Sequence, residues 1–321
     1  MKIKKRIKLK LKSGVKKLII WLIVITIISV FSFNKYKEYK YHQTNEYKLI
    51  SIRYTKSEAK KIEKELTDKQ VKAIIKAAYR DEFILSIIKE KYFLNKNLEK
   101  YTVYHKSNEA TSLTDVVAII NVGADEDWYY HPNKADTSKK ELVLVNKFNL
   151  LDETYSPDDI VPFDQKYRYG EVSATKEVYE AFKRMYDKAK LDNITLLATS
   201  GYRTYARQDE LYKEIRNING KIYADSFAAR AGASEHETGL ALDIFTYQAT
   251  TEDFEKTDTY KWLDAHAADF GFILRYPNEK KYLTGYSPES WHFRYVGEKT
   301  AKKVKSLGIT YDEYYAYYLN K

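Results

Sequence analysis

The sequence has 321 residues, with 55 Lys and Arg against 45 Asp and Glu, and a formal net charge of +10. Nine basic residues and no acidic one fall in residues 1–17, which leaves 46 basic against 45 acidic residues in the rest; this distribution argues against nucleic acid as a partner, because a duplex needs a basic face on the folded domain. There is no cysteine, which excludes a lipoprotein anchor, a thiolate metal site and a cysteine nucleophile.

An uncharged apolar segment follows the basic tail, from Leu18 to Phe33. It is slightly shorter than the ~20 residues of a full membrane span, but lysines at both ends can reach the membrane interfaces. The basic residues before it place the N-terminus in the cytoplasm and the rest of the chain outside the membrane. A cleaved signal peptide is the alternative, and the lack of an A-x-A cleavage pattern favours an uncleaved anchor.

Residues 34–54 are polar and rich in Tyr and Lys, and we interpret them as a stalk. Residues 55–138 are expected to form a mostly helical extension, in which no residue pattern indicates chemistry. Beyond it, apolar periodicity predicts strands at residues 142–147 and 194–199 and helices at residues 175–190, 207–217, 259–270, 299–307 and 311–319.

The stretch from Ser234 to Ile244, SEHETGLALDI, holds a histidine and an aspartate seven residues apart. The Thr-Gly pair between them is typical of a turn. The apolar residues that follow alternate as in a strand with one apolar face, so Asp243 is predicted to point away from that face. A turn followed by a strand can bring His236 beside Asp243. A neutral imidazole next to a carboxylate suits a divalent transition metal, zinc above all.

A second stretch, ESWHFRYVG at residues 289–297, supplies a candidate third ligand. Its aromatic residues alternate with His292 in a strand pattern. Glu289 comes directly after the turn residues Ser287 and Pro288, so it need not follow the strand alternation. Two histidines and one carboxylate with an open coordination position, together with a nearby free glutamate, are suited to metal-assisted hydrolysis.

These two stretches resemble the VanY-type D-alanyl-D-alanine carboxypeptidases, zinc peptidases of the fold shared with lysostaphin and Hedgehog. A third block, SGYRT at residues 200–204 with Gln208, and the segment GFILRYP at residues 271–277 lie in the order expected for that family. The resemblance covers roughly residues 140–310. It implies an α+β fold, a small antiparallel sheet flanked by helices, here joined to the transmembrane helix and the mostly helical extension.

The metal centre and the general base follow from the chemistry and the resemblance together. His236, Asp243 and His292 would hold one Zn²⁺ per chain and leave one position for water. The family's general base falls on Glu289, which would take the proton of the water and pass it to the leaving amine nitrogen.

Three further residues are candidates for contact with the substrate. The family's arginine that stabilises the oxyanion and contacts the substrate falls on Arg203, just after a predicted strand end. The alternative for Arg203 is a surface salt bridge. Ser234 and Gln208 are candidate hydrogen-bond donors to the peptide.

We therefore expect a membrane-anchored, extracellular zinc carboxypeptidase that hydrolyses the terminal D-Ala-D-Ala bond of peptidoglycan stem peptides. An L,D-carboxypeptidase acting on the tetrapeptide shares the same motifs and stays open. A zinc-binding or wall-binding module without turnover is a third possibility, although such a module has no need of Glu289 beside the metal. The expected domains are a cytoplasmic basic tail (1–17), a transmembrane anchor (18–33), a stalk (34–54), the helical extension (55–138) and a zinc D,D-carboxypeptidase domain (139–321).

Overall fold

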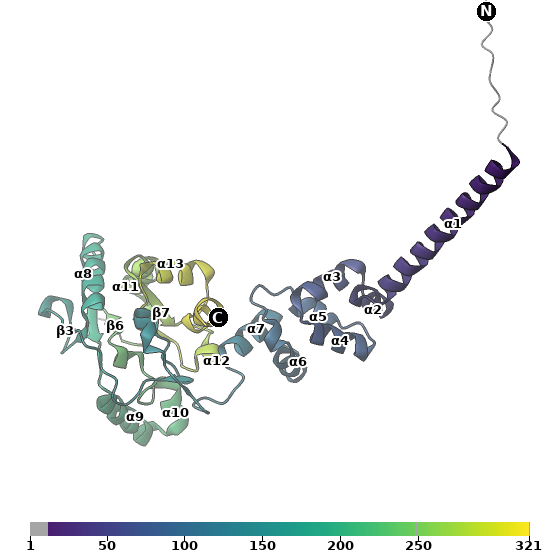
Figure 1. Ribbon diagram of the computed structural model, residues 1–321. Coiled ribbons are helices and arrows are strands. Elements are labelled where there is room, and N and C mark those ends of the chain that lie inside the picture. Colours follow the sequence, from purple (N-terminus) through teal and green to yellow (C-terminus); the bar gives the residue numbers. More distant parts are fainter. Residues whose placement is uncertain (1–11, 248–249, 321) are drawn as a thin grey trace, which may run out of the picture. The chain divides into compact units, whose positions relative to one another are not determined.

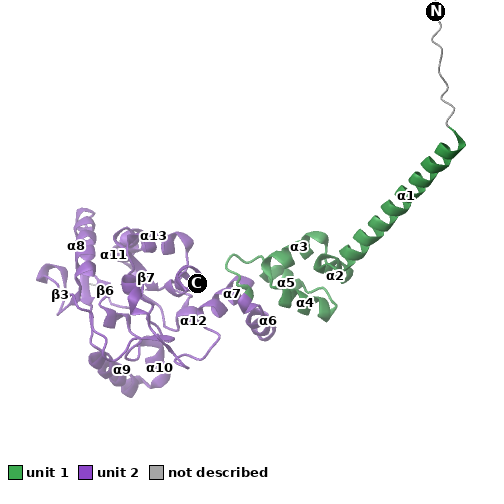
Figure 2. Ribbon diagram, viewed as in Figure 1, with its two compact units in different colours: residues 1–95 green, residues 96–321 purple. Residues whose placement is uncertain are grey.

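The computed structural model describes residues 12–247 and 250–320. Most of the predicted basic tail, residues 1–11, and the final residue of the chain lie outside the described residues. The chain divides between Asn95 and Lys96 into two compact units (Figure 2). The domain limits given above stay a prediction.

The first unit is helical, and its longest element is α1, Ser13–His42. The most apolar window of α1 has a mean hydropathy of 2.2, which is sufficient by length and composition to cross a membrane or to act as a signal sequence. The helix contains the predicted apolar segment and continues into the predicted stalk. The other helices of this unit are α2 (Asn45–Ser51), α3 (Lys56–Glu65), α4 (Asp68–Ala77) and α5 (Glu82–Ile87), and the short 3₁₀ segment η1 (Asn95–Asn97) follows.

The second unit contains the sheet and the remaining helices. Its helices are α6 (Leu98–Ser107), α7 (Leu113–Val122), α8 (Lys176–Leu191), α9 (Tyr205–Asn219), α10 (Lys221–Phe227), α11 (Asp258–His266), α12 (Lys281–Thr284), α13 (Glu298–Leu307) and α14 (Tyr311–Tyr314). Its other short helical segments are η2 (Thr137–Leu142), η3 (Gln165–Tyr167), η4 (Glu235–Thr238), η5 (Phe254–Lys256), η6 (Ala267–Phe270) and the π-helical η7 (Tyr315–Leu319).

Four antiparallel strands form the central sheet, in the order β5-β6-β8-β7. Their bounds are β5 Leu197–Ser200, β6 Ala241–Phe245, β7 Phe272–Tyr276 and β8 Glu289–Tyr295; two small pairs, β1 (Asn133–Lys134) with β2 (Asn149–Leu150) and β3 (Ile160–Pro162) with β4 (Ser173–Thr175), lie outside it. In Figure 1, α8, α11 and α13 lie on one side of this sheet, and α9 and α10 lie on the other. The predicted α+β architecture with a small antiparallel sheet is confirmed.

The core fills the space between the sheet and α8. The apolar stripe of α8, which includes Phe182 and Met185, is fully buried against the strand residues Leu242, Ile244 and Phe293. Because successive side chains of a strand point to opposite faces, the neighbours Asp243 and His292 point to the face away from α8. The strand alternation therefore separates the core from the polar residues of the candidate site.

The predicted strand at residues 142–147 is wrong. Leu142 ends η2, and a turn begins after Asn146. The Asn146 side chain accepts hydrogen bonds from the backbone N–H groups of Phe148 (3.0 Å) and Asn149 (3.0 Å), which reverses the chain. The apolar residues before it are buried, but one of their carbonyls, that of Val143, accepts from the Arg294 side chain at 2.7 Å instead of joining a ladder.

Candidate metal centre

Three neighbouring strands bring polar side chains into one row. Asp243 on β6 is paired in register with Ser200 on β5 and with His292 on β8. Directly opposed residues of antiparallel strands have Cβ atoms about 5 Å apart on the same face. The sheet therefore fixes the separation of the carboxylate from one of the two predicted imidazoles.

The second imidazole reaches the same carboxylate from η4, which lies between two tight turns. Gly239 has a φ of +67° and ends η4, so that the chain turns directly into β6. This is the turn that the Thr-Gly pair predicts. It leaves His236 Nε2 3.5 Å from Asp243 Oδ1, while His292 Nδ1 lies 3.4 Å from the same oxygen.

His236, Asp243 and His292 can hold one metal ion, because their ligand atoms all lie within 4.8 Å of one another. Asp243 Oδ1 is buried and accepts no hydrogen bond in the described structure, although it faces both imidazoles. A buried carboxylate oxygen without a donor is costly, and a cation between the three groups would satisfy it. The donor set of two imidazoles and one carboxylate is that of catalytic zinc.

The two imidazoles are oriented by partners on their other nitrogens. His236 Nδ1 donates to the carbonyl of Gly201 at 2.8 Å, which leaves the Nε2 lone pair directed at Asp243. A side chain at residue 201 would collide with the carbonyl of Ser173, so the backbone can approach only because this residue is glycine. Burial lowers the pKa of His236, which favours the neutral, ligating imidazole.

His292 lies between two glutamates. Its Nε2 is 3.3 Å from Glu235 Oε2, and its Nδ1, the nitrogen that faces Asp243, is 3.6 Å from Glu289 Oε2. Glu235 is held in turn by Arg275 Nε at 2.7 Å and Arg294 Nη1 at 2.9 Å, both on Oε1. A carboxylate behind a ligating histidine fixes its tautomer and the orientation of its ring.

Glu289 lies beside the group of three ligands without belonging to it. Its side chain is only 14% exposed. Burial raises the pKa of Glu289 to about 7; the charge of Asp243 adds to this effect, and those of His292 and Arg203 oppose it. A carboxyl group with a pKa near the working pH is suited to accept and return a proton.

Arg203 is fixed by two side chains and by its backbone. Its Nη1 donates to Gln208 Oε1 at 2.7 Å and its Nη2 to Ser200 Oγ at 3.0 Å, while its backbone N–H donates to the carbonyl of His236 at 3.1 Å. Burial lowers the pKa of this guanidinium. Gln208 Nε2 also donates to the carbonyl of Ala229 at 2.6 Å, so both ends of this amide are engaged and one N–H is left for a ligand.

All seven residues singled out from the sequence line one cavity of about 190 Å³. Arg203 is the only arginine or lysine among the described residues that line it. The cavity therefore brings one positively charged side chain, that of Arg203, together with the other six residues predicted from the sequence. The other walls are mainly apolar and aromatic, and they include Leu211, Ile215, Phe227, Tyr276, Tyr286 and Trp291.

The charged residues behind the centre were not predicted from the sequence. Glu235, Arg275, Arg294 and Asp312 are each at most 2% exposed. One signal was available, because Arg275 stands between apolar residues in the segment GFILRYP. A charge at such a position is rarely buried without a partner.

Comparison with known proteins identifies the family. A family model described as VanY, D-alanyl-D-alanine carboxypeptidase, matches residues 171–298. YodJ of Bacillus subtilis (strain 168) is 39% identical over 181 residues, covering 54% of this chain and 66% of YodJ. A D-alanyl-D-alanine carboxypeptidase of Enterococcus faecalis (strain ATCC 700802 / V583) is 32% identical over 190 residues, covering 56% of this chain and 68% of the relative.

A solved structure is also similar to this chain. The LdcB LD-carboxypeptidase matches with 36% identity and a TM-score of 0.55, covering 58% of this chain and 90% of that chain. The similarities thus span about two thirds of the two sequence relatives and most of the solved structure. The chain belongs to the VanY family of D-alanyl-D-alanine carboxypeptidases.

Proposed function

We propose that this protein is a zinc carboxypeptidase that removes the terminal D-Ala from peptidoglycan stem peptides ending in D-Ala-D-Ala. The observation that carries the proposal is the meeting of three metal-ligating side chains, the Glu289 carboxyl group and the Arg203 guanidinium in one cavity. Family membership supports the choice of substrate.

Zinc would be held by His236 Nε2, Asp243 and His292 Nδ1, the atoms that face one another in the cavity. When bound, zinc supplies a Lewis acid that lowers the pKa of a coordinated water to about 7 and polarises a carbonyl. The protein contributes the fixed positions of the three ligands, because Gly201 and Glu235 orient the two imidazoles.

Glu289 acts as the general base and then as the general acid. Its carboxylate accepts a proton from the water that attacks the carbonyl carbon of the scissile peptide bond. As the C–N bond breaks, the same carboxyl group returns the proton to the leaving amine of D-Ala. The largely buried position of Glu289 beside His292 keeps the group within reach of both events.

Arg203 stabilises negative charge on the substrate. Its two anchoring hydrogen bonds, to Gln208 and Ser200, leave the remaining N–H groups free to meet an oxyanion or the terminal carboxylate. Ser234 lines the same cavity and is positioned to contact the peptide. A fixed cation in a site that otherwise carries carboxylates favours a substrate with a terminal negative charge.

An L,D-carboxypeptidase that removes D-Ala from the tetrapeptide is the second candidate, and the similarity to the LdcB LD-carboxypeptidase favours it. A zinc-binding or wall-binding module without turnover is a weaker alternative, because such a module gains nothing from a largely buried glutamate beside the metal-binding residues.

The experiment is to incubate the zinc-loaded protein with a pentapeptide ending in D-Ala-D-Ala, with the corresponding tetrapeptide, and with each peptide after chelation. Loss of one alanine mass from the pentapeptide alone is expected. Loss from the tetrapeptide alone would replace the D,D assignment with the L,D one. If neither peptide yields a product while zinc is bound, the protein would be a zinc-binding or wall-binding module without turnover.

The cellular location forms part of the proposal. We infer a single-pass protein of the cell membrane whose second unit is extracellular, with α1 as the anchor and a cleaved signal sequence as the alternative. Protease added to intact cells should digest the second unit. Intact mass measured on the membrane fraction would separate the two alternatives, because cleavage would remove α1.

A further inference from the structure

Glu235, behind the metal centre, belongs to a network of four buried charges. Arg275 joins it to Asp312 on α14: Arg275 Nη1 is 2.6 Å from Asp312 Oδ2, and Arg275 Nη2 is 3.2 Å from Asp312 Oδ1. The third nitrogen of the same guanidinium, Nε, donates to Glu235 Oε1 at 2.7 Å. The planar fork of Arg275 is therefore fixed by a carboxylate at each side.

Each oxygen of Glu235 has a different task. Oε1 accepts from both Arg275 and Arg294, whereas Oε2 is directed at His292 Nε2 at 3.3 Å. The two arginines thus fix one oxygen and, through the rigid carboxylate, aim the other at the imidazole. His292 then presents Nδ1 to Asp243, where the metal would be bound.

The network is electrically balanced by Asp312. Two arginines face two carboxylates, and each of the four residues is at most 2% exposed. Without the charge of Asp312, both guanidinium groups would have Glu235 as their only carboxylate. Coulomb attraction in a buried site would then draw that carboxylate toward the arginines and away from His292.

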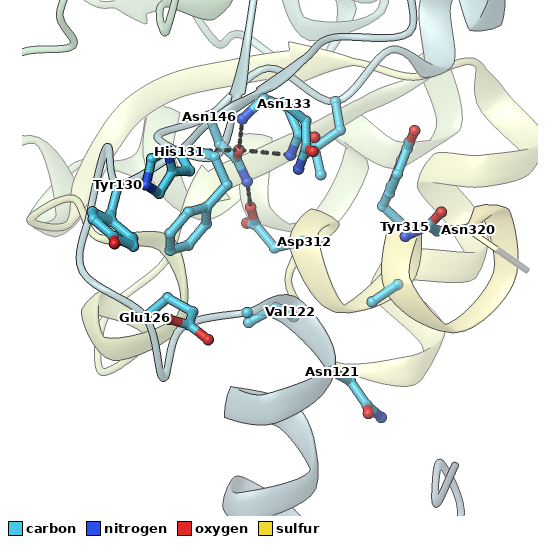
Figure 3. Close-up of a pocket in the computed structure, with 15 residues that line it drawn as sticks. Asn121, Val122, Glu126, Tyr130, His131, Asn133, Asn146, Asp312, Tyr315 and Asn320 are labelled. Atoms are coloured by element: carbon cyan, nitrogen blue, oxygen red, sulfur yellow. Dashed lines mark hydrogen bonds between the residues drawn. The ribbon is translucent and has the colours of Figure 1, made fainter. Parts of the chain in front are cut away.

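Asp312 is itself held from a second direction. Asn146 Nδ2 donates to Asp312 Oδ1 at 2.8 Å, and Figure 3 shows these two side chains directed at one another at the wall of a cavity of about 370 Å³. The Oδ1 of Asn146 is used by the turn at residues 148–149. The amide therefore has its N–H group turned toward Asp312 and cannot be reversed without loss of that turn.

We propose that Asp312 is a positioning residue of the metal centre, which acts through Arg275 and Glu235 to hold the imidazole of His292 in its ligating orientation. The inference rests on the proposed function, since it takes His292 as a zinc ligand. It assigns a role in zinc binding to α14, an element outside the three sequence blocks that resemble the family.

The neighbour of Asp312 provides a matched control. Glu313 is on the same short helix and is also buried, at 5% exposure. Its carboxylate caps the helix by accepting from Thr310 N at 2.8 Å and Thr310 Oγ1 at 3.0 Å, and it does not contact Arg275. Glu313→Gln therefore perturbs α14 by a similar change without touching the network.

The experiment measures the zinc dissociation constant of the full-length protein in detergent by competition with a chelator. Asp312→Asn should weaken zinc binding by up to about 10- to 100-fold, the usual effect of losing the direct partner of a ligating histidine, which here is Glu235. Glu313→Gln should leave the constant within twofold. The visible spectrum of the Co²⁺-substituted protein should change in Asp312→Asn only, and Asp312→Glu, which keeps the charge, should recover part of the affinity.

A folded Asp312→Asn variant with zinc affinity within twofold of the unchanged protein would overturn the inference, as would an equal loss in Glu313→Gln. If Asp312→Asn does not fold, Arg275→Lys decides: it keeps the charge and removes the fork, so zinc binding should weaken, and unchanged binding refutes the network. His292→Ala separates the two proposals, because zinc retained in that variant would refute the metal centre itself.

Discussion

Two glutamates flank the imidazole of His292, and their surroundings differ. On the Nε2 side, Glu235 meets Arg275 and Arg294 within hydrogen-bond distance. On the Nδ1 side, Glu289 lies near the negative charges of Asp243 and Glu235. Burial alone would raise the pKa of both groups, but the two arginines hold the pKa of Glu235 well below its usual range, whereas burial raises the pKa of Glu289 to about 7.

The difference shows that partners, more than burial, decide what a buried carboxyl group can do. Glu235 stays ionised and serves as a fixed acceptor, since its negative charge is balanced. Glu289 can exist in both protonation states, which is the property that proton transfer needs. Substitutions of the imidazole and of residues on either side of it can test this difference.

His292→Ala removes the residue that joins the two sides. It should abolish stoichiometric zinc binding and turnover, because two ligands cannot replace the set of three. Metal analysis after purification without chelator measures the effect. His266→Ala is the control, since that histidine packs against Trp262 in α11 and should keep one zinc per chain. Full zinc content in His292→Ala would contradict the assignment.

Arg275→Gln disrupts the network of buried charges on the Glu235 side of His292. It leaves Asp312 without its bidentate partner, and loss of one member of a buried ion pair costs about 3–5 kcal/mol in the free energy of unfolding. Urea denaturation of the zinc-free protein measures this. Arg184→Gln, which removes an exposed contact to Glu298 at 3.1 Å, should cost at most about 1 kcal/mol. Equal effects of the two substitutions would show that the network adds no stability.

Arg203→Lys tests the cation on the Glu289 side of the cavity. Lysine keeps the charge but cannot reproduce the two anchoring bonds to Gln208 and Ser200, so kcat should fall about 10²- to 10³-fold while zinc stays bound. Steady-state kinetics with the preferred peptide gives the change. Arg207→Lys is the control, because the exposed Arg207 pairs with surface glutamates. A kcat unchanged in Arg203→Lys would place the oxyanion contact elsewhere.

Lys147 shows how burial changes the pKa of a positively charged side chain. Its Nζ donates to the carbonyls of Asp225 and Gly285, each at 2.5 Å, and lies 4.2 Å from the ring centre of Tyr286. Burial lowers the pKa of Lys147 to about 8; the charge of Asp225 opposes this effect, and those of Lys281, Arg230 and Lys221 add to it. Between pH 8 and the ordinary lysine pKa, the unfolded chain binds a proton that the folded protein does not.

Stability should therefore rise with pH across that window and carry the full penalty below it. Relative to Lys147→Met, the protein should gain about 3 kcal/mol in the free energy of unfolding between pH 8 and pH 10.5, because each pH unit contributes about 1.4 kcal/mol when only the unfolded chain holds the proton. Urea denaturation of both proteins at a series of pH values measures the difference. A difference that does not vary with pH would mean that Lys147 titrates normally.

The proposed ligands of the candidate metal centre could be predicted from the sequence because they lie on short, regular elements. Strand alternation places Asp243 on the face of the sheet that points away from the core, and a Thr-Gly turn brings His236 back to Asp243. His292 lies on β8, the strand that pairs with β6. Periodicity also placed α8, α9 and α13 within a few residues. Each of these inferences uses neighbours along the chain, where local geometry is decisive.

The buried charges behind the centre could not be predicted in this way. Glu235 stands next to His236 in the sequence, but its partners Arg275 and Arg294 are 40 and 59 residues away. Only the fold reveals that they meet. The wrong strand at residues 142–147 has a related cause, because Asn146 is buried by side-chain hydrogen bonds that apolar periodicity does not register.

The most direct test of the proposed chemistry is zinc content and turnover measured together on Glu289→Gln. Glutamine keeps the shape of the side chain but cannot accept and return the proton. We expect one zinc per chain and a kcat lowered about 10²- to 10⁴-fold, with little change in substrate binding. Near-normal turnover would contradict the role of Glu289 as the base, and loss of zinc would make it a ligand in place of one of His236, Asp243 and His292.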